Sequence, residues 1–287
     1  MPDEIEPIAL RAARAAGRIH LRRLRHITIG SKSTPIDLVT EADREAEAAI
    51  IRIIRRAFPD HAILAEESGA SAGANARTNS GTNSNRWIID PLDGTTNFAH
   101  GYSPFCVSIA YEHRGIVRLG VVHDAVRKET FVAIRGRGAR LNGSPIRVSR
   151  IGSLDSALLG TGFPYDCRER RRYYLCFWEE FMKHAQGIRR LGAAALDLAY
   201  VAAGRIDGFW EFGLKPWDVA AGALLVREAG GRVTNMDGAA LDLAGGNLIA
   251  TNGRLHNSMI AAIARARPEA ERLDAAEIRA RRPIKSS

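Results

Sequence analysis

The sequence predicts a mixed α/β protein, with an N-terminal α+β part up to about residue 150 and a C-terminal α/β part after it. Two amphipathic helical patterns open the chain, strand-like runs dominate residues 105–149, and strands alternate with helices after 150. With 287 residues, 46% of them hydrophobic, the chain can bury a core as one large domain or two closely packed smaller ones. We expect domains at 1–150 and 151–267, followed by a charged, flexible tail at 268–287.

Two helices are predicted before residue 60. Residues 7–25 place small and apolar side chains opposite a stripe of arginines, which is the pattern of an amphipathic helix. Residues 43–57 repeat alanine and isoleucine at helical spacing, and this second helix begins near Thr40 and Asp43. Pro59 ends it, since proline cannot continue a helix.

A strand and a loop are predicted next. The apolar run 62–65 is short enough to be a strand, and it delivers Glu66 and Glu67 at its C-terminal end. Residues 69–85 consist mostly of glycine, alanine, asparagine, serine and threonine. Such a segment buries too little apolar surface to order itself, so we expect a mobile loop beside these acids.

The remaining elements follow from period and turn residues. Strand-like runs occupy 105–111, 115–123 and 130–135, and Asn142-Gly143 is a hairpin-turn signal. After residue 150 the chain alternates between strand and helix patterns, which is typical of an α/β fold. The predicted strands there are 154–160 and 207–211, and the predicted helices are 170–186, 193–203 and 219–229, the last ending at Gly230-Gly231.

Charge and cysteine usage restrict the possible functions. The formal net charge of +9 permits contact with RNA or an acidic protein, but we favour a solvated face because no aromatic-interleaved basic motif supports base stacking. The three cysteines lack metal-ligand spacing, and their odd number fits a reducing cytoplasm. The acidic N-terminus does not resemble a signal peptide, and no apolar run approaches the roughly 20 residues that span a bilayer. We expect a cytoplasmic protein without a membrane partner.

The most informative stretch is 87–97, Trp-Ile-Ile-Asp-Pro-Leu-Asp-Gly-Thr-Thr-Asn. Three apolar residues lead into Asp90 and Asp93, and a glycine and two threonines follow at once. This order predicts a buried strand that ends in a carboxylate pair, then a tight turn whose backbone N–H groups can hold an anion. Carboxylates would repel that anion unless cations lie between them, so the stretch indicates a magnesium site that holds a phosphate.

Acidic residues also adjoin other apolar or strand-like segments, namely Asp43, Glu66, Glu67 and Asp218. Taken alone, each could be a helix cap or a surface residue, and Asp93-Gly94 could be an ordinary turn. Asp90, however, follows three residues that are expected to be buried. A buried carboxylate requires a cation or strong hydrogen-bond donors, so the set as a whole favours a metal site.

These motifs resemble the inositol monophosphatase family of magnesium-dependent, lithium-sensitive phosphomonoesterases. The matching segments are 37–43, 65–69, 87–97, 189–208 and 215–222, within a resemblance that runs from about residue 8 to 265. The Asp-Pro-Leu-Asp-Gly-Thr-Thr-Asn core together with the distant Trp217-Asp218 is highly specific. The resemblance implies a five-layer α-β-α-β-α sandwich, an active site between the two parts of the chain, and a homodimer.

The resemblance also implies a set of metal ligands. Glu66, Asp90 and the backbone carbonyl of Leu92 would hold one magnesium ion, and Asp90, Asp93 and Asp218 a second. Glu66 would also help to bind a weaker third ion. All of these are hard oxygen ligands, which magnesium prefers.

Catalytic roles follow from the same resemblance. Thr95, paired with Asp43, would orient the attacking water, and Glu66 would act with them through its metal. The backbone N–H groups of Gly94 and Thr95 would contact the phosphate. Glu67 would orient a water or a ligand from behind the metal site. We expect direct attack of water on phosphorus, without a phosphoenzyme.

Substrate contacts are implied for Asp93, Ala194 and Glu211, the last through hydroxyl groups of the leaving alcohol, and Lys32 matches a lysine at the edge of the site. One departure from relatives is Ala193, where they carry serine or threonine. If that hydroxyl touches substrate, selectivity differs here; if it only caps a helix, its loss costs roughly 1 kcal/mol and leaves function unchanged. We favour the second interpretation.

The implied reaction is magnesium-dependent hydrolysis of myo-inositol monophosphate and related polyol phosphates. Histidinol phosphate, fructose 1,6-bisphosphate and nucleotide phosphates are alternative substrates within the same chemistry. A third hypothesis is a binding module of a ribosomal-RNA transcription complex that contacts RNA or elongation factors, a role associated with a bacterial member of the family. The complete carboxylate set predicts activity in either case.

Overall fold

The computed structural model describes residues 2–24, 29–31, 38–73 and 85–281. Its larger sheet has eight strands in the order β10-β9-β8-β7-β6-β5-β3-β4. β3 and β5 run parallel, and the other neighbouring strands are antiparallel. The strands are β3 (Ala62–Ala65), β4 (Gly69–Ser71), β5 (Asn85–Asp93), β6 (Cys106–His113), β7 (Ile116–Asp124), β8 (Glu129–Ile134), β9 (Ala139–Leu141) and β10 (Ser144–Pro145).

A second, five-stranded sheet has the order β12-β11-β13-β15-β14. β11 is parallel to both of its neighbours, whereas β15 is antiparallel to β13 and β14. A 3₁₀ turn, η1 (Leu154–Ser156), precedes this sheet, and β1 (Ile29–Ser31) pairs with β2 (Leu38–Thr40) as a separate ladder. The strands of the second sheet are β11 (Leu158–Thr161), β12 (Gly187–Arg189), β13 (Gly208–Glu211), β14 (Arg232–Thr234) and β15 (Leu248–Thr251).

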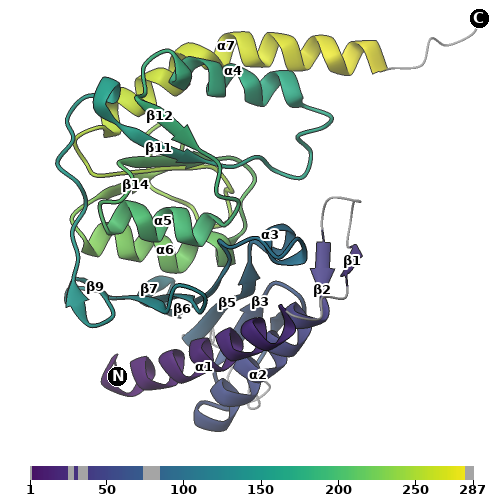
Figure 1. Ribbon diagram of the computed structural model, residues 1–287, viewed down its shortest axis with the longest axis vertical. Helices are drawn as coiled ribbons and strands as arrows, with labels where there is room; N and C mark the ends of the chain where they lie inside the picture. The colour runs from purple at the N-terminus through teal and green to yellow at the C-terminus, as the bar shows by residue number, and fades with distance from the viewer. Residues whose placement is uncertain (1, 25–28, 32–37, 74–84, 282–287) are drawn as a thin grey trace, which may run out of the picture.

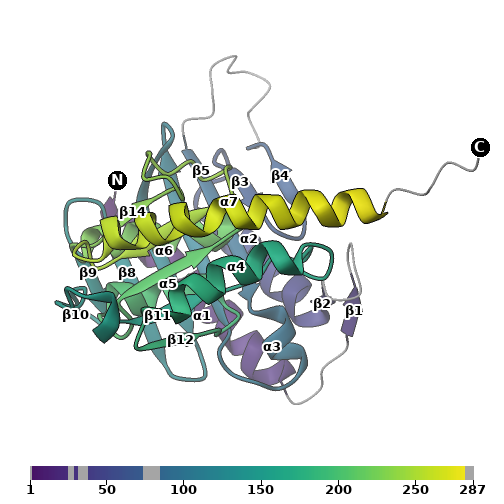
Figure 2. The same cartoon turned by 90° about the horizontal axis from the view of Figure 1, so that it is seen from above.

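Helices and sheets alternate in five layers, as the family resemblance predicts (Figure 1). α1 and α2 cover one face of the larger sheet, α5 and α6 fill the space between the two sheets, and α4 packs beside α7 on the outer face of the second sheet. From above, α7 and α4 lie across the top of the molecule (Figure 2). The helices are α1 (Pro2–Arg23), α2 (Glu41–Ala57), α3 (Thr95–Ala99), α4 (Arg171–Met182), α5 (Ala194–Ala202), α6 (Pro216–Glu228) and α7 (His256–Arg281).

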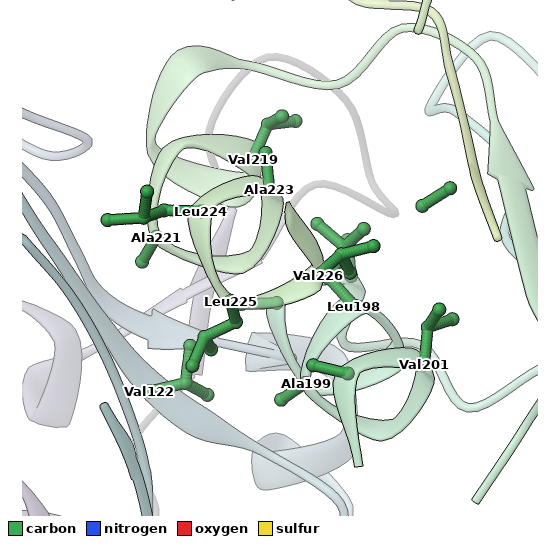
Figure 3. Packing of buried hydrophobic residues seen from close by; sticks show 14 of the residues in the cluster. Val122, Leu198, Ala199, Val201, Val219, Ala221, Ala223, Leu224, Leu225 and Val226 are labelled. Carbon is green, nitrogen blue, oxygen red and sulfur yellow. The ribbon is translucent and has the colours of Figure 1, made fainter. Parts of the chain in front are cut away.

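The central core joins the two sheets through α5 and α6 (Figure 3). Leu198 of α5, Leu225 of α6 and Val122 of β7 are all fully buried in it. Glycines permit the close approach of these elements: a Cβ at Gly120 would lie 2.6 Å from the Ala221 carbonyl oxygen. Helix α6 is therefore buried on nearly all sides, which explains its continuous apolar sequence.

The α1 helix confirms the predicted amphipathic pattern. Its buried face is made mainly of alanines, which let the helix lie close to α2 and to the larger sheet. Arg11, Arg14 and Arg18 are exposed, as expected for a solvated face. Leu21 differs from the prediction, because 44% of its surface is exposed near the end of the helix.

Three predictions made from local patterns differ from the structure. Gly69–Ser71 of the predicted loop forms the edge strand β4 because it can pair with β3, and residues 74–84 lie outside the described part of the chain. The predicted strand 154–160 begins as the 3₁₀ turn, and only β11 pairs. Helix α4 ends at Met182, short of the predicted 186.

The C-terminal segment differs most. Pro268 was expected to begin a charged, flexible tail, yet α7 continues through it to Arg281. Proline removes one backbone hydrogen bond and disturbs the preceding turn, but packing against α4 holds the helix on both sides of it. The division at residue 150 stays a prediction; residues 146–153 form an irregular connection between β10 and η1.

Candidate metal and phosphate site

The two carboxyl groups of the sequence motif, Asp90 and Asp93, flank a bulge at the end of β5. Asp90 pairs with Ser108 of β6 and Asp93 pairs with Cys106, so Pro91 and Leu92 face a single residue of the partner strand. Side chains take over the missing ladder contacts: the Leu92 N–H donates to Asp90 Oδ1 at 2.9 Å. A bulge of this kind bends the strand and redirects its side chains. Here it places both carboxyl groups at the same end of the sheet.

Asp43 and Thr95 are in contact, as the family resemblance implies. Thr95 Oγ1 lies 2.9 Å from Asp43 Oδ1 and 3.0 Å from the Leu92 carbonyl oxygen, so its single proton can go to either acceptor. Asp43 Oδ2 accepts from the Thr40 N–H at 2.7 Å and from the Thr40 hydroxyl at 2.6 Å, which forms a capping box at the start of α2. Asp43 is fully buried, and this burial raises its pKa against the opposing hydrogen bonds from Thr40 and Thr95.

Gly94 forms the turn that follows the bulge. Its φ of 92° lies in the left-handed region, and a Cβ there would come within 3.1 Å of the Pro104 carbonyl oxygen. A glycine is therefore required at this position for both reasons. Gly94 and Thr95 both line the cavity at this turn.

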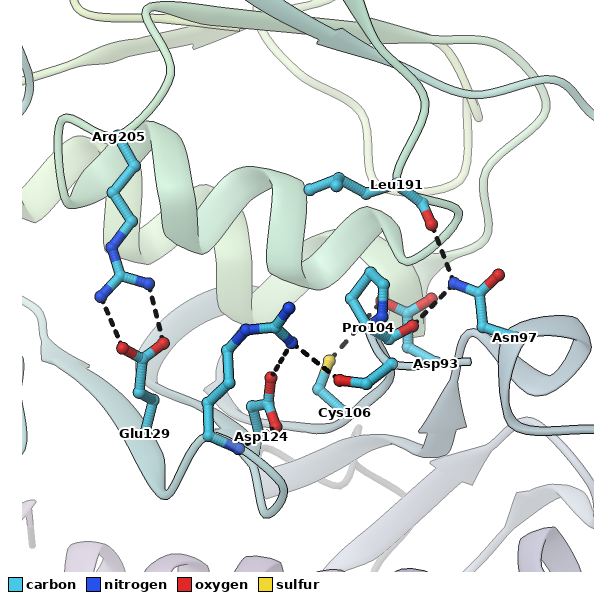
Figure 4. Close-up of polar contacts among 10 residues, drawn as sticks. Asp93, Asn97, Pro104, Cys106, Asp124, Glu129, Leu191 and Arg205 are labelled. Carbon is cyan, nitrogen blue, oxygen red and sulfur yellow. Dashed lines mark hydrogen bonds and ion pairs between the residues drawn. The ribbon is translucent and has the colours of Figure 1, made fainter. Parts of the chain in front are cut away.

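Asp93 connects the two sheets. Its Oδ2 accepts the backbone N–H of Ala195 at 2.7 Å, at the start of α5, and the Cys106 thiol lies 3.7 Å away (Figure 4). Position 193 is the N-cap of α5, and Ala193 makes no side-chain cap there, so Asp93 supplies the cap from the other sheet. Burial raises the pKa of Asp93 to about 6, although the Ala195 N–H acts in the opposite direction.

Two further carboxyl groups come from separate elements. Glu66 follows β3, and its N–H donates to the Ile89 carbonyl at 3.1 Å, beside the neighbouring strand β5. Asp218 is the third residue of α6, where its Oδ2 accepts the Lys215 N–H at 2.7 Å. Burial and the charges of Glu66, Asp93 and Asp218 raise the pKa of Asp90 well above its usual range. Burial, and after it the charge of Asp93, also raises the pKa of Asp218 well above its usual range.

This cluster fits a hard divalent cation. Several carboxyl groups that disfavour each other's ionisation need positive charge between them to remain ionised. Within the described residues, no group of three or more histidine, cysteine, aspartate or glutamate side chains lies close enough together to hold a metal ion. Magnesium usually retains several waters and binds through one or two carboxylates together with substrate phosphate. Glu66, Asp90, Asp93, Asp218 and the Leu92 carbonyl are the groups that would hold it.

The carboxyl groups line a cavity of about 270 Å³ between the two sheets. Gly94, Thr95, Ala194 and Glu211 also line it. A second cavity of about 510 Å³ adjoins it and shares Glu66, Lys215 and Trp217. The site therefore has room for a phosphate and a small alcohol, with open space beside them.

Glu211 lines the same cavity and comes from the second sheet. It ends β13, and the absence of a side chain at Gly162 makes room for its carboxyl, since a Cβ there would lie 2.1 Å from Glu211 Oε1. Burial raises the pKa of Glu211 to about 8, and the positive charge of Arg190 opposes that shift. A carboxyl that is largely protonated at neutral pH can both donate to and accept from the hydroxyl groups of an alcohol.

Three predicted site residues remain: Glu67, Ala194 and Lys32. Glu67 lies behind the site: its N–H donates to Glu47 Oε2 at 2.9 Å, and its charge contributes to the raised pKa of Asp43. Ala194 is nearly buried and lines the cavity. Lys32 lies outside the described residues, so its predicted place at the edge of the site stays a prediction.

Sequence reasoning missed two contributors. Asn97 ends the motif, and its Nδ2 donates to the carbonyl oxygens of Pro104 at 2.7 Å and Leu191 at 2.8 Å, which ties α3 to the segment before α5 (Figure 4). Arg190 lines the cavity beside Glu211. The sequence indicates only where these residues stand: Asn97 belongs to the motif, and Arg190 precedes α5. It does not indicate which residues they contact.

Known proteins share this architecture and sequence. The sequence model of the inositol monophosphatase family matches residues 1–269. The chain is 49% identical over 261 residues to the Nus factor SuhB of Pseudomonas aeruginosa, covering 89% of this chain and 94% of that protein. It is also 49% identical over 239 residues to an inositol-1-monophosphatase of Synechocystis, covering 82% and 80% of the two chains.

Solved structures agree with this similarity. The extragenic suppressor protein SuhB of Bartonella henselae superposes with a TM-score of 0.84 at 40% identity, covering 90% of this chain and 98% of that one. A more distant IMPase/NADP phosphatase, complexed with Mg²⁺ and phosphate, superposes with a TM-score of 0.77 at 26% identity, covering 91% and 95%. The match along nearly the whole chain, in sequence and in fold, means that this protein belongs to the inositol monophosphatase family.

Proposed function

We propose that this protein is a magnesium-dependent phosphomonoesterase that hydrolyses myo-inositol monophosphate and related polyol phosphates. The observation that carries the proposal is the convergence of Glu66, Asp90, Asp93 and Asp218 on one cavity, next to the hydrogen-bonded pair Thr95 and Asp43. A similar protein is named an inositol-1-monophosphatase, and a related structure holds Mg²⁺ and phosphate. Both support a divalent metal and a phosphorylated substrate here.

The chain's own residues divide the reaction between them. The Thr95 hydroxyl donates a hydrogen bond to Asp43, and its oxygen can then accept a hydrogen bond from the attacking water. The N–H groups of Gly94 and Thr95 stabilise the negative charge on the phosphoryl oxygens. When bound, magnesium polarises the phosphate and lowers the pKa of a bound water. Glu211, which lines the same cavity, holds the hydroxyl groups of the departing alcohol.

Phosphate release is the direct test. Purified protein is assayed in Mg²⁺ with inositol 1-phosphate, histidinol phosphate and fructose 1,6-bisphosphate, beside the Asp93→Asn variant. We expect inositol 1-phosphate to have the highest kcat/KM, because Glu211 suits a polyol. The variant should lose release of phosphate from every substrate. Unchanged release by Asp93→Asn would contradict the metal assignment, and a preference for histidinol phosphate would replace the inositol assignment.

A role in transcription is the second candidate, supported by the similarity to proteins named Nus factor SuhB and by the exposed arginines of α1. A homodimer is a further expectation of the family resemblance. Pull-down with transcription elongation factors, run with the same protein preparation, tests the role in transcription. Sedimentation equilibrium tests the homodimer. Binding of a factor with no cleavage of any phosphomonoester would favour the binding-module hypothesis over the enzyme.

A further inference from the structure

His20 is a buried histidine next to the metal-binding bulge. It lies in the last turn of α1, where the neighbouring residues Arg18 and Arg22 face solvent, but its own side chain is completely buried. Its Nε2 is 2.9 Å from the carbonyl oxygen of Pro91, a residue 71 positions away. A polar side chain in such a position needs a structural or functional reason, because its burial costs free energy unless it is hydrogen-bonded.

The surroundings of His20 determine its protonation state. Its ring packs edge-on against Phe105, with the centroids 5.8 Å apart, and at 59° to Phe98 at 6.1 Å. The Pro91 carbonyl can only accept, so Nε2 must carry the proton. Nδ1 has no hydrogen-bond partner within the described residues, and burial lowers the pKa of the imidazole to about 4. His20 is therefore neutral near pH 7, with its one donor directed at the bulge.

The Pro91 carbonyl belongs to the part of β5 that has lost its ladder pairing. The register jumps from Asp90 to Asp93, so neither Pro91 nor Leu92 is paired with a residue of β6. Asp90 satisfies the Leu92 N–H, and Thr95 lies within hydrogen-bond distance of the Leu92 carbonyl. His20 satisfies the Pro91 carbonyl, which leaves this backbone segment held by side chains rather than by a neighbouring strand.

We propose that His20 is a positioning residue of the metal site, which holds the Pro91 carbonyl and so sets the direction of the Asp90 and Asp93 carboxyl groups and of the Leu92 carbonyl. This inference rests on the proposed function, since it assigns a role toward the metal ions of that site. It connects α1, which contributes no ligand, to the geometry of the ligands. Groups that orient metal ligands from behind typically change metal affinity about 10- to 100-fold when removed.

Calorimetric titration with Mg²⁺ alone tests the proposal on five purified proteins: the wild type, three His20 variants and one control. His20→Leu removes the donor, and we expect it to weaken Mg²⁺ binding about tenfold or more. His20→Gln places an amide N–H near the position of Nε2 and should recover most of that affinity. His20→Asn is also polar, but its side chain is one methylene shorter than that of glutamine, and its amide cannot reach the Pro91 carbonyl. We therefore expect its Mg²⁺ affinity to be as low as that of His20→Leu.

His256→Leu is the matched control. His256 is also completely buried, and its ring nitrogens lie 2.9 and 3.0 Å from the hydroxyl groups of Thr234 and Thr251, in the second sheet. We expect this variant to lose thermal stability like His20→Leu while binding Mg²⁺ as the wild type does. Wild-type Mg²⁺ affinity in folded His20→Leu would overturn the proposal. If that variant does not fold, equal Mg²⁺ affinities of the glutamine and asparagine variants would overturn it.

Activity is measured separately, so that the two proposals fail in different ways. If the wild type binds Mg²⁺ but releases no phosphate, the proposed function is wrong, and the order of affinities among the His20 variants still decides the role of His20. If the wild type binds no Mg²⁺, both proposals are wrong. A rise in the Mg²⁺ concentration for half-maximal activity of His20→Leu, with little change in the substrate KM at saturating Mg²⁺, would add support.

Discussion

The carboxyl end of β5 and the outer layer of α4 and α7 use charge in opposite ways. At β5, Asp90 and Asp93 are buried beside other acids, and their pKa values are raised. In the outer layer, acids lie near arginines at the surface, as in the 2.6 Å pair between Arg265 and Glu180. Buried like charges reduce stability unless a cation joins them, whereas exposed pairs contribute little in either direction. The first region therefore requires positive charge to keep its carboxyl groups ionised, whereas the second gains little from its ion pairs.

The largest expected effect comes from Asp90→Asn. The amide oxygen can still accept the Leu92 N–H, so the bulge should persist, but a carboxylate shared between the predicted metals is lost. We expect phosphate release to fall about 1,000-fold or more, since metal ions contribute several kcal/mol to transition-state stabilisation. Thermal unfolding without metal should show equal or greater stability. A clear loss of stability without metal would contradict the statement that the buried like charges at β5 reduce stability.

We expect the next largest effect, a fall in kcat, from Thr95→Ala. Removing the hydroxyl that links Asp43 to the attacking water should lower kcat about 100-fold or more, the usual range for proton-transfer groups. The KM for substrate should change little, because the backbone N–H groups remain. Thr95→Ser retains the hydroxyl and should recover most of the rate. Equal rates for the alanine and serine variants would show that the hydroxyl has no part in the reaction.

His256, in the outer region, gives a pH dependence of stability. Burial lowers its pKa from about 6.5 to about 4, so the unfolded chain binds a proton before the folded one does. Its contribution is therefore present above pH 6.5 and is lost as the pH falls toward 4. Urea unfolding at pH 7 and pH 5 should show that wild type loses about 1–2 kcal/mol more than His256→Leu. An identical loss in both proteins would mean that His256 does not titrate in this way.

The smallest effect is expected for Arg265→Ala. This substitution breaks the surface pair with Glu180, and we expect the free energy of unfolding to change by less than about 1 kcal/mol. High salt should shrink the difference further, since exposed charges are screened. Urea unfolding at low and high NaCl measures both. A loss of several kcal/mol would show that the outer charges stabilise the fold, and the contrast between the regions would disappear.

Local patterns were sufficient for most of the elements. Helical period predicted α2 and α5 to within a few residues, and alternation with turn residues predicted β6, β7 and β8. The errors occur where neighbours in space decide. Gly69–Ser71 is a strand only because β3 offers an edge, and α7 passes through Pro268 only because α4 supports it. Neither partner can be recognised from the composition of the segment itself.

The candidate site divides in the same way. The motif at 87–97 predicted a buried strand that ends in a carboxylate pair and a tight turn after it, and the resemblance to the family assigned the distant partners. The bulge between the two carboxylates was not predicted. The structure brings Thr95 to Asp43 and places Asp93 at the start of α5, 102 residues away. The second contact bears on Ala193: its position is the N-cap of α5, which agrees with the interpretation that the missing hydroxyl is a helix cap.

By itself, the sequence determined the local backbone states and the chemistry available, because periodicity, glycine and proline act within a few residues and hard oxygen ligands can be read from residue types. Only the tertiary structure decided which side chains complete one another. Asp93 caps a helix of the other sheet, and His20 contacts Pro91 from a helix that carries no ligand. Such contacts depend on how layers pack and where loops close, and no local pattern of residues records that geometry.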